Sequence, residues 1–172
     1  MNTTLRRRLY ATATIFVVMG LAAPALAQTP QSVTGSIDVV SPALNIAKNT
    51  DLAFGTVVRP GAGSGTVSID ANSGNVTTSN GITLIGNTAT RATFTITGQP
   101  SSNIQITFPS TFNLTRTSGT ETLSVSLQTT STGGQIGGGG TLGFSMGGQL
   151  VLSSNTVTGA YVGTYTVTAA YN

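Results

Sequence analysis

The sequence contains no cysteine, tryptophan or histidine, and only 6% of its residues are charged. Without cysteine no disulfide can form, so stability has to come from the packing of an apolar core. The absence of cysteine and histidine also excludes most nucleophile–base pairs and most zinc sites. The few acidic residues lie in separate segments, which disfavours a paired-carboxylate site. We therefore expect a protein that is not an enzyme and that uses no cofactor and no metal.

Residues 1–27 have the pattern of a secretory signal peptide. Arg6, Arg7 and Arg8 precede an apolar run from Ala11 to Ala23, and small residues follow at 25–27. The run is short and rich in small residues, which favours a cleaved signal over a membrane anchor. We expect cleavage after Ala27, export to the periplasm, then a place at the cell surface or outside the cell. No transmembrane span is expected after cleavage.

The mature chain is expected to be electrically neutral, because three of the seven basic residues lie in the signal peptide. The remaining charges are equal in number: Lys48, Arg59, Arg91 and Arg116 against Asp38, Asp51, Asp70 and Glu121. No basic stripe is left to neutralise phosphates, so nucleic acid is not an expected partner.

Apolar residues recur at every second position in a series of short segments, which is typical of strands with one buried face. The segments are Leu52/Phe54, Val67/Ile69, Ala92/Phe94/Ile96, Ile104/Ile106/Phe108, Leu123/Val125/Leu127 and Tyr161 to Val167, with a further short strand around Leu44 and Ile46. We expect an all-β, immunoglobulin-like antiparallel β-sandwich over residues 42–172. Residues 28–41 form an N-terminal extension.

Turn signals separate these segments at 59–65, 70–75, 79–81, 98–102, 117–119 and 146–148, and the glycine-rich stretch 133–140 predicts a long hairpin loop. GAGSG at 61–65 lacks the lysine and helix of a phosphate loop. DANSGN at 70–75 lacks the second carboxylate and the bidentate glutamate of a calcium loop, so a turn is favoured. Whether calcium binds near Asp70 stays open.

Two segments near the ends of the sequence look complementary. Gly159, Tyr161, Gly163, Tyr165, Val167, Ala169 and Tyr171 share one face of a predicted strand at a sheet edge. An unpaired edge is a liability unless another strand covers it. Val33, Gly35, Ile37 and Val39 alternate with polar residues in the extension and form a candidate donor strand.

The end of the sequence resembles the carboxyl terminus of chaperone–usher pilins, which have a penultimate aromatic residue and a glycine fourteen positions from the end. Tyr171 and Gly159 occupy these positions here. LAFGTV at 52–57 also resembles the Leu-x-Phe-Gly motif of spore-coat-U-type and related bacterial secreted domains, many of them of unknown function.

The resemblance implies an incomplete sandwich that lacks its last strand. A periplasmic chaperone would supply a strand to the 159–171 edge, and the extension of the next subunit would replace it during assembly at an outer-membrane usher. The expected function is a structural subunit of a bacterial surface fibre, with copies of itself or related subunits as partners. A second interpretation stays open: 32–40 is an internal strand of a self-contained secreted or outer-membrane-associated sandwich that binds a surface polymer or a protein.

Overall fold

The computed structural model describes residues 34–40 and 42–172, so the expected signal peptide and Val33 lie outside the described residues. Contacts divide the chain into two units, 1–38 and 39–172, and the fold concerns the second. The strands are β1 (Asn45–Thr50), β2 (Thr56–Val58), β3 (Ser64–Ile69), β4 (Val76–Thr78), β5 (Thr83–Ile85), β6 (Ala92–Thr97), β7 (Asn103–Thr107), β8 (Thr111–Arg116), β9 (Thr122–Thr129), β10 (Gly133–Gln135), β11 (Thr141–Ser153), β12 (Tyr161–Val162) and β13 (Thr168–Tyr171). The described residues contain no helix, and hence none that could cross a membrane.

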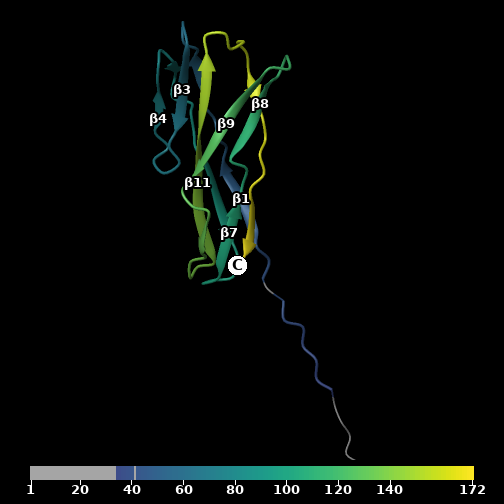
Figure 1. Cartoon of the computed structure of the whole chain (residues 1–172). Helices are drawn as coiled ribbons and strands as arrows, with labels where there is room; N and C mark the ends of the chain where they lie inside the picture. The colour runs from purple at the N-terminus through teal and green to yellow at the C-terminus, as the bar shows by residue number, and fades with distance from the viewer. Residues whose placement is uncertain (1–33, 41) are drawn as a thin grey trace, which may run out of the picture. The chain divides into compact units, whose positions relative to one another are not determined.

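The main sheet runs in the order β1-β6-β11-β9-β8-β12, and every pairing in it is antiparallel (Figure 1). The long strand β11 joins two regions of this sheet. Its first half pairs with β6, and its second half pairs with β3, which in turn pairs with β4. The prediction of an all-β antiparallel sandwich is confirmed.

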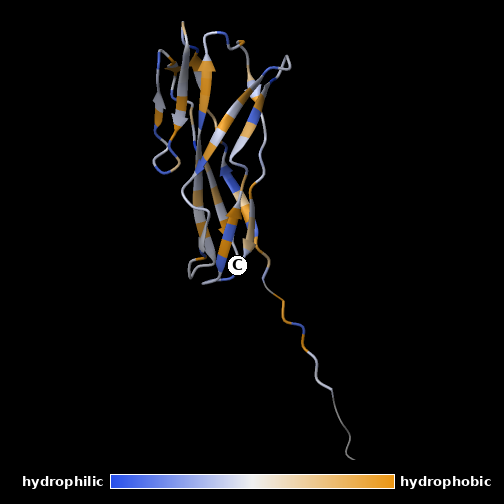
Figure 2. Ribbon diagram, in the orientation of Figure 1, coloured by the Kyte–Doolittle hydropathy of each residue, from blue (hydrophilic) through white to orange (hydrophobic). Residues whose placement is uncertain are grey.

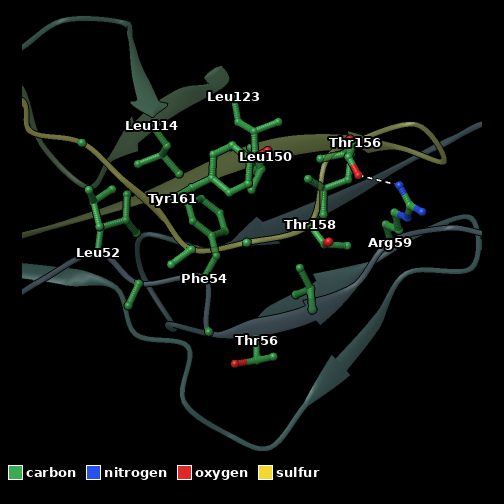
Figure 3. Close-up of a pocket in the computed structure, with 18 of the residues that line it drawn as sticks. Leu52, Phe54, Thr56, Arg59, Leu114, Leu123, Leu150, Thr156, Thr158 and Tyr161 are labelled. Atoms are coloured by element: carbon green, nitrogen blue, oxygen red, sulfur yellow. Dashed lines mark hydrogen bonds between the residues drawn. The ribbon is translucent and has the colours of Figure 1, made fainter. Parts of the chain in front are cut away.

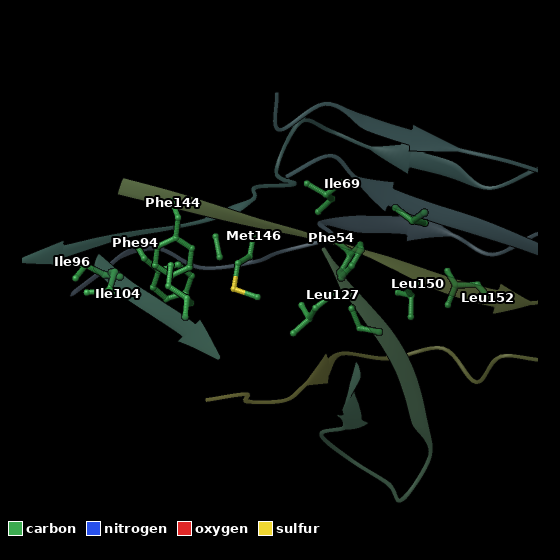
Figure 4. Close-up of a cluster of buried hydrophobic side chains, with 14 of the residues drawn as sticks. Phe54, Ile69, Phe94, Ile96, Ile104, Leu127, Phe144, Met146, Leu150 and Leu152 are labelled. Carbon is green, nitrogen blue, oxygen red and sulfur yellow. The ribbon is translucent and has the colours of Figure 1, made fainter. Parts of the chain in front are cut away.

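A second sheet, β10-β7-β13, lies against the main one, and β2 and β5 form a separate two-stranded ribbon. The core is made where the sheets meet: Ile104 and Ile106 of β7 join Phe94 of β6 and Phe144 of β11 (Figure 4). The two phenylalanine rings stack with centroids 4.9 Å apart. Apolar and polar residues alternate along most strands (Figure 2), and no polar side chain is buried among the described residues.

The predicted turn at 146–148 is wrong, because these residues lie inside β11. The glycines there allow two backbones to approach closely. A Cβ on Gly147 would overlap the carbonyl oxygen of Ile69, and it would come within 2.7 Å of the amide nitrogen of Ala71. At this position β11 changes its partner from β6 to β3.

The predicted loop at 133–140 is wrong in its first part. Gly133, Gly134 and Gln135 form β10 and pair with β7, and Ile136 is fully buried in the core. A Cβ on Gly133 would come within 2.5 Å of the carbonyl oxygen of Ile104, so glycine again permits a close approach between strands.

The predicted terminal strand is not continuous. β12 pairs with β8 of the main sheet, whereas β13 pairs with β7 of the second sheet. Residues 163–167 connect the two and belong to no strand. The segment therefore crosses from one layer of the sandwich to the other, which the alternation of apolar residues does not reveal.

Candidate functional site

An open groove of about 800 Å³ lies in one side of the sandwich. Its first wall is formed by residues 51–57 and Arg59, which follow β1, and its second wall by residues 156–163, which include β12. The two walls are far apart in sequence and face each other across a floor of leucines (Figure 3).

The floor is apolar and continuous with the core. Leu114 of β8, Leu123 of β9, and Leu150 and Leu152 of β11 line it. Leu150 and Leu152 are also members of the core cluster, as is Phe54 (Figures 3 and 4). The floor thus continues the core to Leu114 and Leu123, which are only partly buried, and apolar groups placed in the groove would extend it.

The first wall contains the Leu-x-Phe-Gly motif, and the structure gives each of its residues a role. Leu52 and Phe54 line the groove, whereas the backbone of Ala53 between them pairs with Thr90 on the outer side. Gly55 has φ +71°, and a Cβ there would lie 2.8 Å from the Thr88 hydroxyl oxygen. Only glycine adopts this backbone without strain.

The second wall contains Gly159, whose φ is +146°. A Cβ at this position would lie 3.1 Å from Cδ of Arg116, so the backbone passes directly over the arginine side chain. Next to it, Ala160 accepts a hydrogen bond from the amide of Thr117 (2.9 Å). The Tyr161 hydroxyl donates to the carbonyl oxygen of Val157 (2.7 Å). The first bond ties the wall to the residue that follows β8, and the second lies within the wall.

Two contacts of arginine side chains support the walls. Arg59 Nη1 donates to the carbonyl oxygen of Thr156 (2.6 Å) and so joins the two walls directly (Figure 3). Arg116 Nε pairs with Glu121 Oε2 (2.7 Å) below Gly159. The hydrogen bond from Arg116 lowers the pKa of the Glu121 carboxyl, and the same bond raises the pKa of Arg116.

Within the part of the chain that the structure describes, the strand pairing of each wall is on its outer side, and the Arg59–Thr156 hydrogen bond joins the walls. β1 and β12 are the two ends of the main sheet, and the groove lies between the residues that follow β1 and β12 itself. A strand placed in the groove would therefore meet a backbone edge without strand pairing on both sides, except at Thr156, and an apolar floor below.

The structure divides the seven residues predicted for the acceptor edge into two groups. Gly159, Tyr161 and Gly163 line the groove. The others lie further along the segment, where Tyr165, Val167, Ala169 and Tyr171 are half-buried and contact the core.

Aromatic contacts fix this second group. The ring of Tyr165 lies 4.8 Å from that of Phe112, centroid to centroid. Burial raises the pKa of Tyr165, and the nearby negative charge of Asp51 adds to the effect. The Tyr171 hydroxyl accepts a hydrogen bond from the amide of Gln99 (2.8 Å). This half of the segment is thus part of the sandwich packing rather than of the open groove.

Three of the four predicted donor residues are described: Gly35, Ile37 and Val39. Residues 34–40 belong to no strand. The side chains of Ile37 and Val39 are both 85% exposed, and the adjacent Val40 is 83% exposed. Such exposure is unusual for a run of branched apolar residues and marks a segment that can gain from burial.

The segment 70–75 forms a closed turn. Asp70 Oδ1 accepts hydrogen bonds from the amides of Asn72 (3.1 Å) and Ser73 (2.6 Å) and from the Ser73 hydroxyl (2.7 Å). The bonds from Ser73 lower the pKa of Asp70. Residues 34–40 and 42–172 contain no group of three or more acidic residues placed to hold a metal ion.

Sequence reasoning missed the first wall as a functional element. It identified Leu52, Phe54 and the floor residue Leu123 as strand residues, and it assigned no role to Arg59, Leu114, Leu150 or Leu152. The motif at 52–57 was the one signal for this wall, and it did not show that 156–163 would lie opposite.

Comparison with known proteins gives one match. A family model described as Domain of unknown function (DUF4402) matches residues 44–171, which include both walls and the floor. No curated protein and no solved structure matches the chain.

Proposed function

We propose a function for this chain from the geometry of the groove. The chain belongs to the DUF4402 family, and the description of that family assigns no activity. The protein is a structural subunit of a bacterial surface fibre, and a β-strand from another polypeptide completes its sandwich. It is exported, it has no catalytic role, and its partners are copies of itself or related subunits. A periplasmic chaperone and an outer-membrane usher are the expected assembly partners.

One observation carries the proposal: the groove lies between β12, at one end of the main sheet, and residues 51–57, which follow β1 at the other end. Added strands bind to sheet edges through main-chain hydrogen bonds, and pockets for alternate side chains give specificity. Here one strand would pair with both edges and cover Leu114 and Leu123, which are only partly buried. The exposed apolar residues of 34–40 supply a strand of the required character.

Head-to-tail addition of strands explains why such a subunit would form a fibre. A donor segment and an acceptor groove are different surfaces of the same chain. Each oligomer therefore has an unused donor segment at one end and an unused groove at the other. Contacts of this kind do not close unless the rotation between subunits forms a ring, and they otherwise build a filament.

The proposal is tested by comparing the assembly of the full chain with that of a groove variant. Leu123→Asp places a carboxylate in the apolar floor, where an added strand would have to bury it at a large free-energy cost. Val162→Asp, at a residue that lines the groove but is 60% exposed, is a second variant with less risk to folding. Val151→Asp is the matched control, because Val151 is 53% exposed and lies outside the groove.

Light scattering and negative-stain electron microscopy measure assembly, and thermal unfolding shows that each variant is folded. The parent and Val151→Asp should form oligomers or fibres, and the two groove variants should remain monomers. A parent chain that stays monomeric at all concentrations would contradict the proposal and favour a self-contained sandwich that binds a polymer or protein. Normal fibres from both groove variants would also contradict it.

A further inference from the structure

We infer that Arg59 sets the direction in which a strand lies in the groove, by pairing with an acidic side chain near one end of that strand. This inference rests on the proposed function and gives a recognition role to a residue that the proposed function does not use. It follows from the directions of the two walls and from the charges that line them.

The two walls of the groove run in opposite directions. The main sheet passes from β1 to β12 through five pairings, and all five are antiparallel. Each antiparallel pairing reverses the chain direction, so β1 and β12 run opposite ways. The contacts at the two ends of the groove agree: Arg59 bonds to Thr156 at one end, and at the other end the charge of Asp51 acts on Tyr165, just beyond the second wall.

Backbone pairing alone therefore leaves the direction of an inserted strand open. A strand between two walls of opposite direction is antiparallel to one wall and parallel to the other, whichever way it enters. Both placements turn the same alternate side chains toward the leucine floor. A preference for one direction thus requires a feature that differs between the two ends of the groove.

The charges of the groove provide such a difference. Asp51 and Arg59 line the groove near its opposite ends, and Asp51 forms an ion pair with Lys48. Arg59 takes part in neither of the two ion pairs found among the described residues, and its Nη1 donates to the carbonyl oxygen of Thr156 (Figure 3). The Thr156 end of the groove therefore has a positive charge that no described carboxylate balances.

A guanidinium group is suited to bind a carboxylate at this end. It has several N–H donors in a planar fork, and the bond to Thr156 uses one nitrogen. An acidic side chain beside Arg59 would gain a charge-assisted hydrogen bond, whereas the same side chain at the other end would lie beside Asp51 and gain none. Because Arg59 is exposed to solvent, the gain is small, and it selects a direction rather than supplying most of the affinity.

Two peptides with acetylated and amidated ends test this inference. The first has the sequence of residues 32–40, in which the one acidic residue, Asp38, lies toward the carboxyl end. The second exchanges Thr34 and Asp38, so the carboxylate moves toward the amino end while composition and net charge stay the same. Each peptide is made in two forms, with an added cysteine at its amino or its carboxyl end.

Crosslinking reports which end of the peptide lies at the Thr156 end of the groove. Each peptide is mixed in excess with the full chain carrying Thr158→Cys, at an exposed residue that lines the groove near Thr156, and treated with a short bis-maleimide. The chain has no cysteine of its own. The peptide with Asp38 should crosslink through its carboxyl-terminal cysteine in roughly threefold or higher yield, and the exchanged peptide should show the reverse preference.

Arg59→Gln should abolish both preferences, and about 1 M salt should weaken them, because the pair is exposed to solvent. Arg91→Gln is the matched control and should leave both preferences unchanged. Arg91 Nη1 also donates to a backbone carbonyl oxygen, that of Ala71 (3.1 Å), but Arg91 lies outside the groove. A purely structural role of Arg59 would not produce a preference that follows the carboxylate from one end of the peptide to the other.

The remaining outcomes separate this inference from the proposed function. Equal yields from both ends, the same preferred end for both peptides, or a preference that persists in Arg59→Gln would overturn the inference. The proposed function would then stand, because the peptides still enter the groove. Crosslinking to Thr158→Cys no greater than to Val151→Cys, at an exposed residue outside the groove, would mean that no strand enters and would overturn both.

Discussion

Replacing Gly159 with alanine should destabilise the subunit through the backbone rather than through lost contacts. Gly159 has φ +146°, a region that residues with a side chain rarely adopt. Holding alanine there costs about 1–3 kcal/mol. The new methyl group also lies 3.1 Å from Cδ of Arg116, but that flexible side chain can shift by a few tenths of an ångström. Backbone strain therefore dominates the expected loss.

Thermal unfolding followed by circular dichroism measures this loss. For a domain of this size, 1–3 kcal/mol lowers the midpoint by roughly 3–15 °C. Gly138→Ala is the matched control, because nothing lies within 4 Å of its Cβ position and its φ is not in the left-handed region. The control should unfold within about 0.5 kcal/mol of the parent. Equal midpoints for Gly159→Ala and Gly138→Ala would refute the described path of the second wall.

Three further predictions concern other parts of the sandwich. Gly147→Ala should destabilise the fold by about 1–3 kcal/mol or more, because the methyl group meets backbone atoms of the neighbouring strand that cannot move aside. Gly143→Ala in the same strand should be tolerated. Urea unfolding of both variants measures the difference. Glu121→Gln should lower the free energy of unfolding above pH 4.5, which is the ordinary pKa of this carboxyl. The difference from the parent should vanish as pH falls through the lowered pKa of Glu121 in the folded state, and a difference that persists in acid would contradict the ion-pair origin. Addition of calcium should leave the unfolding midpoint unchanged, because Asp70 Oδ1 is already bonded within its turn; a rise with calcium would show a binding site there.

Alternation of apolar residues predicted much of the fold because the buried face of a strand has a period of two. Ile104 and Ile106 of β7, and Val125 and Leu127 of β9, are buried as expected. β8 and β11 were missed for physical reasons. β8 has only two alternating apolar residues, Phe112 and Leu114, and the glycines of β11 resemble a turn in sequence although they serve close contact between strands.

The candidate site was predictable only in part. The sequence marked Gly159, Tyr161 and Gly163, and all three line the groove. The sequence did not show that the acceptor edge ends at Gly163. Residues 168–171 pair with β7 instead, and this pairing depends on the arrangement of the two sheets. Pairing partners and register are tertiary properties, and a period-two pattern is compatible with many of them.

The Leu-x-Phe-Gly motif at 52–55 has a structural explanation in this chain. Leu52 and Phe54 face the groove, and Gly55 then turns the chain into β2 with a positive φ. The motif thus builds part of one wall of the groove, and Gly159 belongs to the other.

The central claim is that a strand from another copy completes each subunit. It is tested most directly by moving residues 32–40 to a position after Asn172, through a Gly/Ser linker of about 15 residues. The terminal segment from Gly163 to Asn172 spans about 30 Å at about 3.3 Å per residue, so Asn172 lies at most about that far from the groove. A linker of this length can span the distance. The molar mass of this variant and of the parent is then measured by size-exclusion chromatography with light scattering. We predict oligomers for the parent and a stable monomer for the rearranged chain; a monomeric parent that the rearrangement destabilises would contradict the account.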